Sequence, residues 1–376
     1  MQLRNDLSPS DSSIERIPCA QPHQWLYLFG SEGGIVYSEI HNRFAGLDAA
    51  GVVAYLSFDT DLHAAQASIH APDNVIESIR ALAMGIFPPT EPQHEWPAFT
   101  PNLSGETIEI GSVPASVQFP AGPLEKLCRD PFRGCQPTTL PPQCHLSARH
   151  TKHGWSIFVN DQPWMPIEKE EQLGLGFLHA ARAMLYQLAN YNIAFHAAMV
   201  AQQDRGILLC APRESGKSTL TAYLTATGFD FLADEPALLQ LDTGSVQPLP
   251  LPISLKSGSW PHIAPICPAL TDSQLHKRSD GMPIRLLLPP EQHISRNAQK
   301  LTHILFPSYT PSPVAQPERL SPLRTLILLD TGGMLLAPGS TRKTFEAFLH
   351  MLQNVPAFAL PFSSLSEAAQ ILHTLR

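Results

Sequence analysis

The first ninety residues contain two short apolar runs followed by two stretches in which apolar side chains recur at helical spacing. Two strands are predicted at residues 24–30 and 34–40, and two helices at residues 47–58 and 71–87. A Ser-Glu-Gly-Gly turn joins the strands, and Asp48 stands near the start of the first helix, where a short acidic side chain is favoured. The pattern predicts a small α+β domain in residues 1–94.

A proline-rich segment at residues 87–101 predicts a linker after this domain. Three apolar runs beyond it predict strands, at residues 106–112, 115–119 and 155–161. Residues 168–192 then show a long amphipathic pattern with an acidic first turn, which favours a helix because the amino end of a helix carries partial positive charge. Together these elements predict an accessory region at residues 102–190.

The remaining residues, 191–376, predict the main α/β core. Two short strands, a helix and a buried strand are predicted in that order, at residues 194–201, 206–211, 218–227 and 229–235. A hairpin is predicted at residues 236–253, followed by three carboxy-terminal helices, the first after Pro322 and the others at residues 340–353 and 363–375. A polar loop lies between the second strand and the first helix, and the chemistry of the chain is concentrated there.

This loop reads Ala-Pro-Arg-Glu-Ser-Gly-Lys-Ser, residues 211–218, and matches the phosphate-loop pattern G-x-x-x-x-G-K-[ST] except at its first position. A pattern relaxed to admit alanine there arises by chance in roughly 3 of 100 chains of this length. The flanking strand and helix are what the chemistry requires, because backbone N–H groups at a helix start bind phosphate. We therefore predict ATP and Mg²⁺ as cofactors. Nucleotide contacts are predicted for Arg213, Glu214, Ser215, Gly216, Lys217, Ser218 and Thr219, with Lys217 on the β- and γ-phosphates and Ser218 on Mg²⁺.

Two residues depart from an ordinary phosphate loop. Ala211 replaces glycine where the strand ends, which is tolerable if its φ stays negative. Glu214 is harder to accommodate, since a carboxylate ~4 Å from a phosphate costs about 4 kcal/mol per unit charge at an effective dielectric near 20. Glu214 must therefore point outward or pair with a cation, for which Arg213 is a candidate.

Two acidic residues end the apolar strand after the loop helix. Asp234 is predicted to be the base that takes the hydroxyl proton of a phosphoryl acceptor, and Glu235 to help hold Mg²⁺. His196 opens the strand that precedes the loop and could reach the γ-phosphate or the acceptor. Outside this context a lone histidine is more often a core residue, and a strand-end acid is more often only solvated.

The composition of the chain argues against nucleic-acid and membrane partners. The chain has 376 residues, 43% hydrophobic, with a net charge of -8, so it can bury a sizeable core and lacks the basic excess typical of nucleic-acid binding. We see no signal-peptide pattern and no apolar run of the ~18 residues that a membrane span needs. We expect a cytoplasmic protein without nucleic-acid or membrane partners.

Three cysteines and three histidines crowd into one region of the chain. They are Cys128, Cys135, Cys144, His145, His150 and His153. Their spacing does not match a zinc site, and none of the six cysteines forms a C-x-x-C pair. We expect reduced thiols and surface histidines.

The segment from His196 through the loop to Asp242, together with Pro-Leu-Pro-Leu-Pro-Ile-Ser-Leu-Lys further on, resembles the P-loop proteins of the HPr serine kinase and phosphoenolpyruvate carboxykinase type. It is more similar still to the HPr-kinase-related proteins found beside bacterial peptide-modification genes. The resemblance implies a mixed sheet, phosphoryl transfer from ATP to a hydroxyl, and a homo-oligomer, since such proteins are often oligomers. It also implies phosphate or acceptor contacts for Lys256 and Arg285, although either could be an ordinary surface charge.

Residues 33–61 resemble PqqD-type peptide-recognition domains, which have a winged-helix-like α+β fold. In such domains a leader peptide adds a strand to the edge of the sheet. A plain accessory domain is an equally good interpretation of this segment.

Three functions remain open at this stage. The first is an ATP-dependent kinase for Ser or Thr hydroxyls of a ribosomally made peptide or protein. The second is a kinase for a small-metabolite hydroxyl, such as a free amino acid or a sugar. The third is a nucleotide-binding scaffold with little catalysis, which the irregular loop favours.

Overall fold

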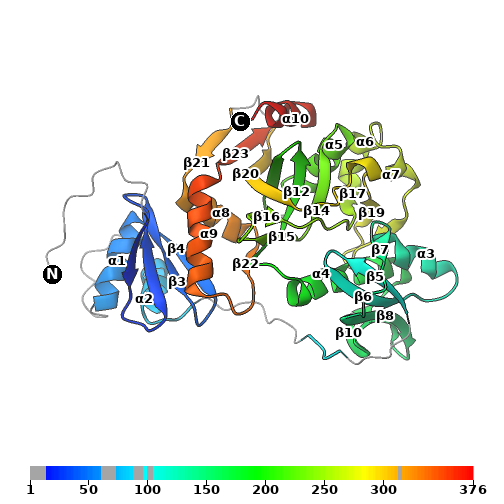
Figure 1. Ribbon diagram of the computed structural model, residues 1–376, viewed down its shortest axis with the longest axis horizontal. Helices are drawn as coiled ribbons and strands as arrows, with labels where there is room; N and C mark the ends of the chain where they lie inside the picture. The colour runs from blue at the N-terminus through cyan, green and yellow to red at the C-terminus, as the bar shows by residue number, and fades with distance from the viewer. Residues whose placement is uncertain are drawn as a thin grey trace. The chain divides into compact units, whose positions relative to one another are not determined.

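The computed structural model describes residues 14–60, 73–87, 96–99, 105–212, 214–311 and 316–375, and these residues form a mixed α/β structure (Figure 1). The chain divides into two compact units. The first contains residues 1–93, 321–327 and 338–354, and the second contains residues 94–320, 328–337 and 355–376. Among the described residues, no helix is long and apolar enough to cross a membrane.

The first unit is built on an antiparallel sheet covered by helices. The sheet runs in the order β1 (Glu15–Pro18), β2 (Gln24–Leu28), β3 (Gly33–Ser38) and β4 (Arg43–Asp48). Helices α1 (Ala49–Thr60) and α2 (Asp73–Ala83) pack on it through a core that includes Leu26, Val36 and Tyr55. The predicted strands and helices are confirmed, and Asp48 caps α1 by accepting a hydrogen bond from the Gly51 amide at 2.7 Å.

The helix α9 (Arg342–Asn354) completes this unit although it lies some 300 residues along the chain. The Phe345 ring stacks on Tyr37 with 4.3 Å between ring centroids, and lies 5.5 Å from the rings of Tyr27 and Phe44. Glu346 pairs with Arg16 of β1 at 2.7 Å. The amphipathic pattern of α9 predicts its helix, but its apolar face serves the amino-terminal sheet and not the core predicted at residues 191–376.

The second unit begins with a six-stranded sheet covered by α4. The sheet runs β10 (Gln162–Ile167), β9 (Gly154–Val159), β8 (Cys144–Thr151), β6 (Val113–Gln118), β5 (Glu106–Ile110) and β7 (Gln136–Pro137). The helix α4 (Leu173–Leu188) is shorter than the predicted 168–192. Residues before it form a 3₁₀ turn because the Gln172 side chain accepts the amides of Glu168 and Lys169.

The clustered cysteines and histidines lie mostly inside this region. Cys128, Cys135 and Cys144 are free and buried. His145 is also fully buried and hydrogen-bonds Ser116 at 3.1 Å, so the expectation of a surface histidine is wrong at this position. It lies on β8, on a buried stretch of the strand, where a neutral imidazole with one partner can be accommodated. His150 and His153 are exposed.

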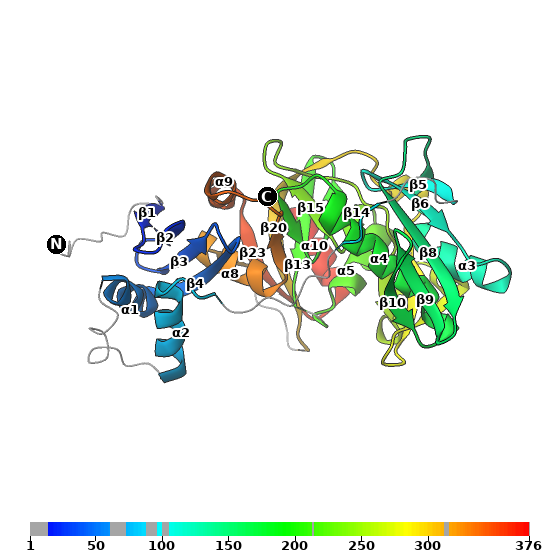
Figure 2. The same cartoon turned by 90° about the horizontal axis from the view of Figure 1, so that it is seen from below.

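The central sheet of the second unit carries the predicted loop. Its relevant strands are β12 (Ala197–Gln202), β13 (Arg205–Cys210), β14 (Asp230–Asp234), β20 (Gln299–Tyr309) and β23 (Ala357–Phe362). They run in the order β14-β12-β13-β20-β23, with β13, β20 and β23 parallel to one another (Figure 2). The strand ends of β13, β20 and β23 therefore meet at one edge of the sheet. Helices α5 (Lys217–Ala226) and α10 (Leu365–Thr374) pack against it through a shared apolar core.

The hairpin predicted at residues 236–253 is shorter than expected. Its strands are β15 (Ala237–Gln240) and β16 (Ser245–Val246), whereas β17 (Ile253–Lys256) belongs to a separate sheet with β18 (Leu275–Lys277) and β19 (Pro283–Leu287). Pro248, Pro250 and Pro252 lie between the two sheets, and because proline lacks the amide donor the strand pairing cannot continue through them. This break brings β17 beside α5.

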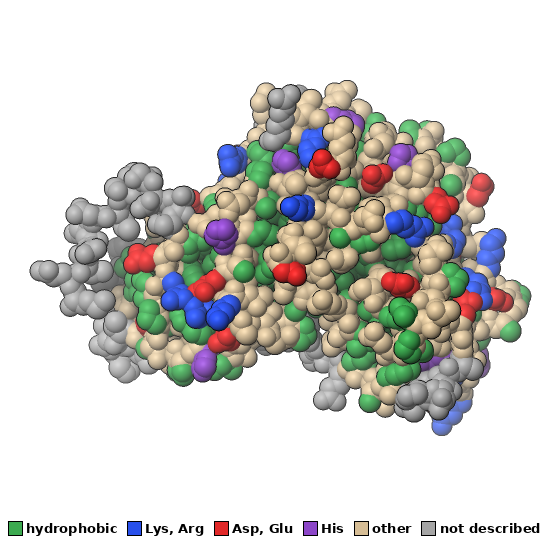
Figure 3. Space-filling model, in the orientation of Figure 1, with side chains coloured by type: hydrophobic (Ala, Val, Ile, Leu, Met, Phe, Trp, Pro, Cys, Tyr) green, Lys and Arg blue, Asp and Glu red, His purple; other side chains and the backbone are tan. Residues whose placement is uncertain are grey.

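The central sheet has three further short strands, and one more predicted helix lies in this part of the chain. Strand β11 (Ile193–Phe195) pairs with β15 and with β22 (Met334–Leu336) at the far end of the sheet, and β21 (Glu318–Leu320) pairs with β23. The helix α8 (Pro322–Thr331) is confirmed at the position predicted after Ser321. On the face shown in Figure 3, Lys and Arg side chains lie among Asp and Glu side chains and do not gather in one basic area.

Candidate active site

The phosphate-loop sequence lies where its chemistry requires it, between β13 and α5. Gly216 is the N-cap of α5 and has φ 87°, a left-handed conformation that favours glycine. The first turn of α5 contains no acidic side chain, so the positive end of the helix dipole is not neutralised from within the helix. Free amides at this end are suited to an anionic group.

The first departure from the pattern does not distort the loop. Ala211 is 1% exposed and is not among the described residues with positive φ, so its methyl group fits where β13 ends. This is the condition under which alanine can replace the usual glycine. Arg213, the predicted partner of Glu214, lies outside the described residues.

The second departure is accommodated by a different partner. Glu214 has φ 71°, an unfavourable conformation for a residue with a Cβ, and its side chain is 77% exposed. The carboxylate pairs with Lys256 of β17 at 3.0 Å. The loop acid therefore points outward and is neutralised by the same lysine for which the sequence predicts a phosphate contact.

Replacing Glu214 with glutamine is expected to tighten ATP binding by less than tenfold. The change removes an exposed negative charge beside the loop and leaves Lys256 unpaired and available to phosphate, but screening by water keeps the effect small. Titration calorimetry with ATP at low and high salt measures it. The gain should shrink at high salt, and weaker binding by the variant would contradict this electrostatic account.

Lys217 is held inside the site by groups of the protein. It is 6% exposed, its Nζ donates to the His196 carbonyl at 2.8 Å, and it lies 3.8 Å from Glu235 Oε1. A buried ammonium group needs such partners, since an unpaired buried charge is costly. The charge is thus already in place at the amino end of α5.

Asp234 lies beside the loop hydroxyl. Its carboxylate is 1% exposed, with Oδ2 3.4 Å from Ser218 Oγ and 3.4 Å from the Ser254 amide. Burial raises the pKa of Asp234, and the negative charge of Glu235 raises it further, against the lowering effect of Lys217 and Arg182. A buried carboxylate that resists ionisation is suited to receive a proton or a cation.

The residues around Ser218 fit Mg²⁺ only together with a bound nucleotide. No three His, Cys, Asp or Glu side chains converge as a metal site in the part of the chain that the structure describes. Mg²⁺ commonly binds through one or two protein groups, water and substrate phosphates. The Ser218 hydroxyl and the Asp234 carboxylate, whose oxygens lie 3.4–3.5 Å apart, are therefore enough protein groups for such a site. Ser218, a predicted ligand, and Asp234 are the groups that would hold it, whereas Glu235, the other predicted ligand, is paired with Arg182, His196 and Lys217.

Glu235 is the centre of a group of cations. It forms ion pairs with His196 Nε2 and, at 3.2 Å, with Arg182 Nη1, in addition to Lys217. Burial opposes its charge, but the hydrogen bond from His196 and the positive charges of Arg182, His196 and Lys217 outweigh this effect and lower the pKa of Glu235. Both carboxylate oxygens have cationic partners, so this residue holds the lysine and histidine in place.

Replacing Glu235 with glutamine is expected to destabilise the fold by about 3 kcal/mol at pH 7, because Arg182 and Lys217 lose their counter-ion and His196 loses its carboxylate partner. The lowered pKa means that this stabilisation is present above the ordinary carboxyl pKa of 4.5 and is lost as the pH falls through the lower folded-state value. Urea unfolding at pH 7 and at pH 3 measures both effects. Glu291→Gln, at an 88%-exposed surface pair, is the control and should change stability by less than about 0.5 kcal/mol.

Arg182 is the site residue that the sequence analysis missed. It comes from α4, and its Nη2 also donates to the Asp234 carbonyl at 3.2 Å. The sequence contains a signal, because Arg182 is the only Lys or Arg between Leu173 and Leu188 in a mostly apolar helix. A charge in such a setting requires a buried partner.

The other predicted residues occupy different places. Thr219 exchanges a hydrogen bond with Ser259 at 2.6 Å, and Ser215 Oγ is buried with no partner among the described residues. Arg285 does not join the loop cluster. Its guanidinium donates to three carbonyl groups at the end of α7 (Ala269–Asp272) and lies 5.2 Å from the Trp260 ring.

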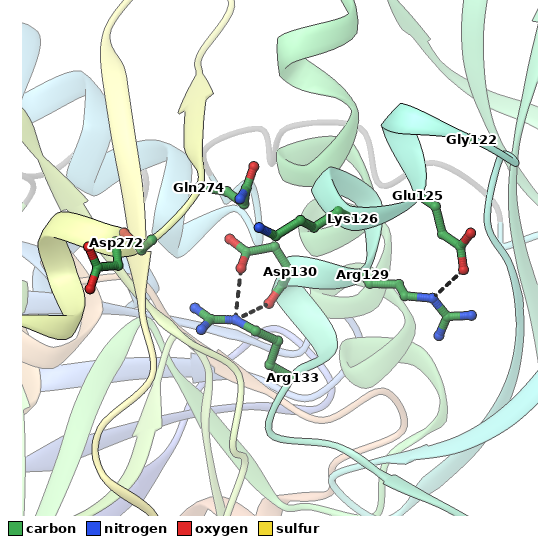
Figure 4. Close-up of a pocket in the computed structure, with 9 residues that line it drawn as sticks. Gly122, Glu125, Lys126, Arg129, Asp130, Arg133, Asp272 and Gln274 are labelled. Atoms are coloured by element: carbon green, nitrogen blue, oxygen red, sulfur yellow. Dashed lines mark hydrogen bonds and ion pairs between the residues drawn. The ribbon is translucent and has the colours of Figure 1, made fainter.

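A cavity of about 490 Å³ lies between α3 (Pro123–Arg129) and the segment after α7, and no residue of the phosphate loop lines it (Figure 4). Its walls carry as many acidic as basic side chains, and several pair with each other. Arg129 binds Glu125 at 2.8 Å, and Arg133 binds Asp130 at 2.7 Å. None of the predicted phosphate or acceptor contacts lines it.

No protein-family model matches the chain, and no curated protein matches it. A solved structure described as the HPr(Ser) kinase/phosphatase from Coxiella burnetii is similar over 48% of this chain and 87% of its own, with 13% sequence identity and a TM-score of 0.26. This is a distant structural similarity, and no part of the function proposed below is argued from it.

Proposed function

We propose that this protein is an ATP-dependent phosphotransferase that transfers the γ-phosphate to a hydroxyl group. The observation that supports it best is the convergence of Lys217, Ser218 and the two adjacent acids at the amino end of α5. A helix start with free amides, a lysine and a hydroxyl binds a triphosphate, and a buried carboxylate beside them serves the reacting end. A scaffold that only holds a nucleotide has no need of a buried carboxylate beside the reacting phosphate.

In the proposed reaction the acceptor oxygen attacks the γ-phosphorus, the bond to the β–γ bridging oxygen breaks, and ADP leaves. The acceptor proton passes to Asp234, whose raised pKa favours proton uptake. Lys217 neutralises charge on the phosphates, and Glu235 keeps it directed toward the loop. Mg²⁺ bound at Ser218 would supply further positive charge to the β- and γ-phosphates.

The amino-terminal unit supports a peptide as acceptor. Its sheet ends in β1 and β4, each of which pairs with only one other strand within the described part of the chain. An extended peptide can add to such an edge through main-chain hydrogen bonds. We therefore favour Ser or Thr of a peptide over a small metabolite, in keeping with the resemblance of this segment to PqqD-type domains.

The experiment follows the γ-phosphate of labelled ATP with Mg²⁺ in size-fractionated extract of the native host. Wild type is compared with Lys217→Ala and with omission of Mg²⁺. Label in a peptide fraction, absent in both controls, supports the proposal, and label in the small-molecule fraction assigns a metabolite acceptor. ATP that is bound but left intact with every fraction would establish the scaffold function instead.

Deleting residues 1–93 is not a clean test of the acceptor class. The helix α9 would lose the sheet on which Phe345 packs, and a large apolar face would become exposed in the truncated protein. Loss of activity in that deletion would then reflect aggregation as easily as loss of peptide docking. The full chain is therefore used throughout.

A further inference from the structure

One exposed aromatic side chain stands at the edge of the sheet that carries the loop. Tyr309 is the last residue of β20 and is 62% exposed, whereas the other six tyrosines of the chain are buried or partly buried. Exposure alone is ordinary for a surface residue. What distinguishes Tyr309 is the position of its ring relative to the phosphate loop.

Tyr309 is connected to the loop through a second aromatic ring. It pairs in register with Phe362 of β23, and the two rings lie 5.9 Å apart at 70°. Phe362 is 2% exposed, and a Cβ added to Gly216 would stand 3.6 Å from its ring, an ordinary van der Waals contact. The N-cap of α5, Phe362 and Tyr309 therefore form a continuous row.

The order of the strands indicates how a bound triphosphate would lie across the site. Asp234 is the last residue of β14, and Glu235 follows it. On one side of β13 the sheet continues through β12 to β14, and on the other side it continues through β20 to β23. A triphosphate with its γ end toward Asp234 must extend its remaining part toward β20 and β23. The exposed ring of Tyr309 stands on that side.

We propose that Tyr309 stacks on the base of the nucleotide whose phosphates bind at the amino end of α5. This inference rests on the proposed function and identifies the other end of the same ligand. A flat, partly apolar ring suits any base, because every base presents a π-face. The site should accept purine nucleoside triphosphates with little discrimination between adenine and guanine, and the phenol hydroxyl should not be needed.

The test compares two probes, ATP and inorganic tripolyphosphate, each titrated with Mg²⁺ into the full chain. Tyr309→Ala should weaken ATP binding about tenfold or more and leave tripolyphosphate binding unchanged. Tyr309→Phe should bind both probes as wild type does. Leu140→Ala, at a 54%-exposed apolar residue of the same unit, is the matched control and should change neither.

The outcomes separate this inference from the function on which it depends. Wild-type ATP affinity in Tyr309→Ala, or equal losses for both probes, would overturn the stacking role while leaving the phosphate site intact. Equal binding of ATP and tripolyphosphate by wild type would likewise overturn the stacking role and leave the phosphate site intact. Failure of wild type to bind either probe would overturn the phosphate site itself, and the base contact with it.

Discussion

Replacing Lys217 with alanine is expected to reduce phosphoryl transfer by about 10²–10³-fold. Lys217 is the ammonium group placed at the amino end of α5, and loss of one preorganised donor to a developing anion has this typical cost. Because its charge is fixed by the His196 carbonyl and Glu235 before any ligand arrives, little reorganisation is needed on binding. Steady-state rates with labelled ATP, at saturating and limiting concentrations, measure the effect.

The fold should survive this change. Glu235 keeps Arg182 and His196 as partners, so the carboxylate does not become an unpaired charge. Lys277→Ala is the matched control, because Lys277 is 42% exposed and pairs with Glu171 at 3.1 Å in the same unit. The control should retain wild-type rates and a similar unfolding midpoint. A Lys217→Ala protein that is folded and transfers phosphate at the wild-type rate would remove the lysine from the mechanism.

The loop could be predicted from sequence because all of its determinants are contiguous. A buried strand, Gly216, Lys217 and an uninterrupted helix follow one another within some twenty residues, and each is encoded by local pattern. The helix α9 shows the limit of the same reasoning. Its period predicts an apolar face but not which surface that face covers, since the partner ring of Tyr37 lies about 300 residues away.

The electrostatics of the site could not be predicted, because the charged partners of the loop residues are distant in the sequence. Glu214 required a cation, but Lys256 is supplied by β17, whose place beside α5 depends on a run of prolines that ends the preceding hairpin. The role of Glu235 depends on Arg182 of α4. The sequence predicts a base at Asp234 and a metal ligand at Glu235, but it contains no sign that their surroundings move the two pKa values in opposite directions.

Replacing Asp234 with asparagine is expected to abolish detectable transfer and, at pH 7, to raise the free energy of unfolding. Asparagine keeps the size and an acceptor for the Ser254 amide but cannot take up the acceptor proton. The raised pKa means that folded protein binds more protons than unfolded protein above the ordinary value of 3.8, so ionised Asp234 lowers stability as the pH rises. The variant removes this destabilisation, and the difference should vanish below pH 3.8.

Two measurements on this variant separate the roles that one carboxylate beside Ser218 can have. Binding of ATP without Mg²⁺ should be preserved, since Lys217 and the helix start remain. If transfer stays lost at every Mg²⁺ concentration, Asp234 is the base, whereas recovery at high Mg²⁺ would make it a metal ligand. A gain in stability together with a loss of transfer is the combination expected of a residue kept for chemistry, because a buried, reluctantly ionised carboxylate has no benefit for the fold.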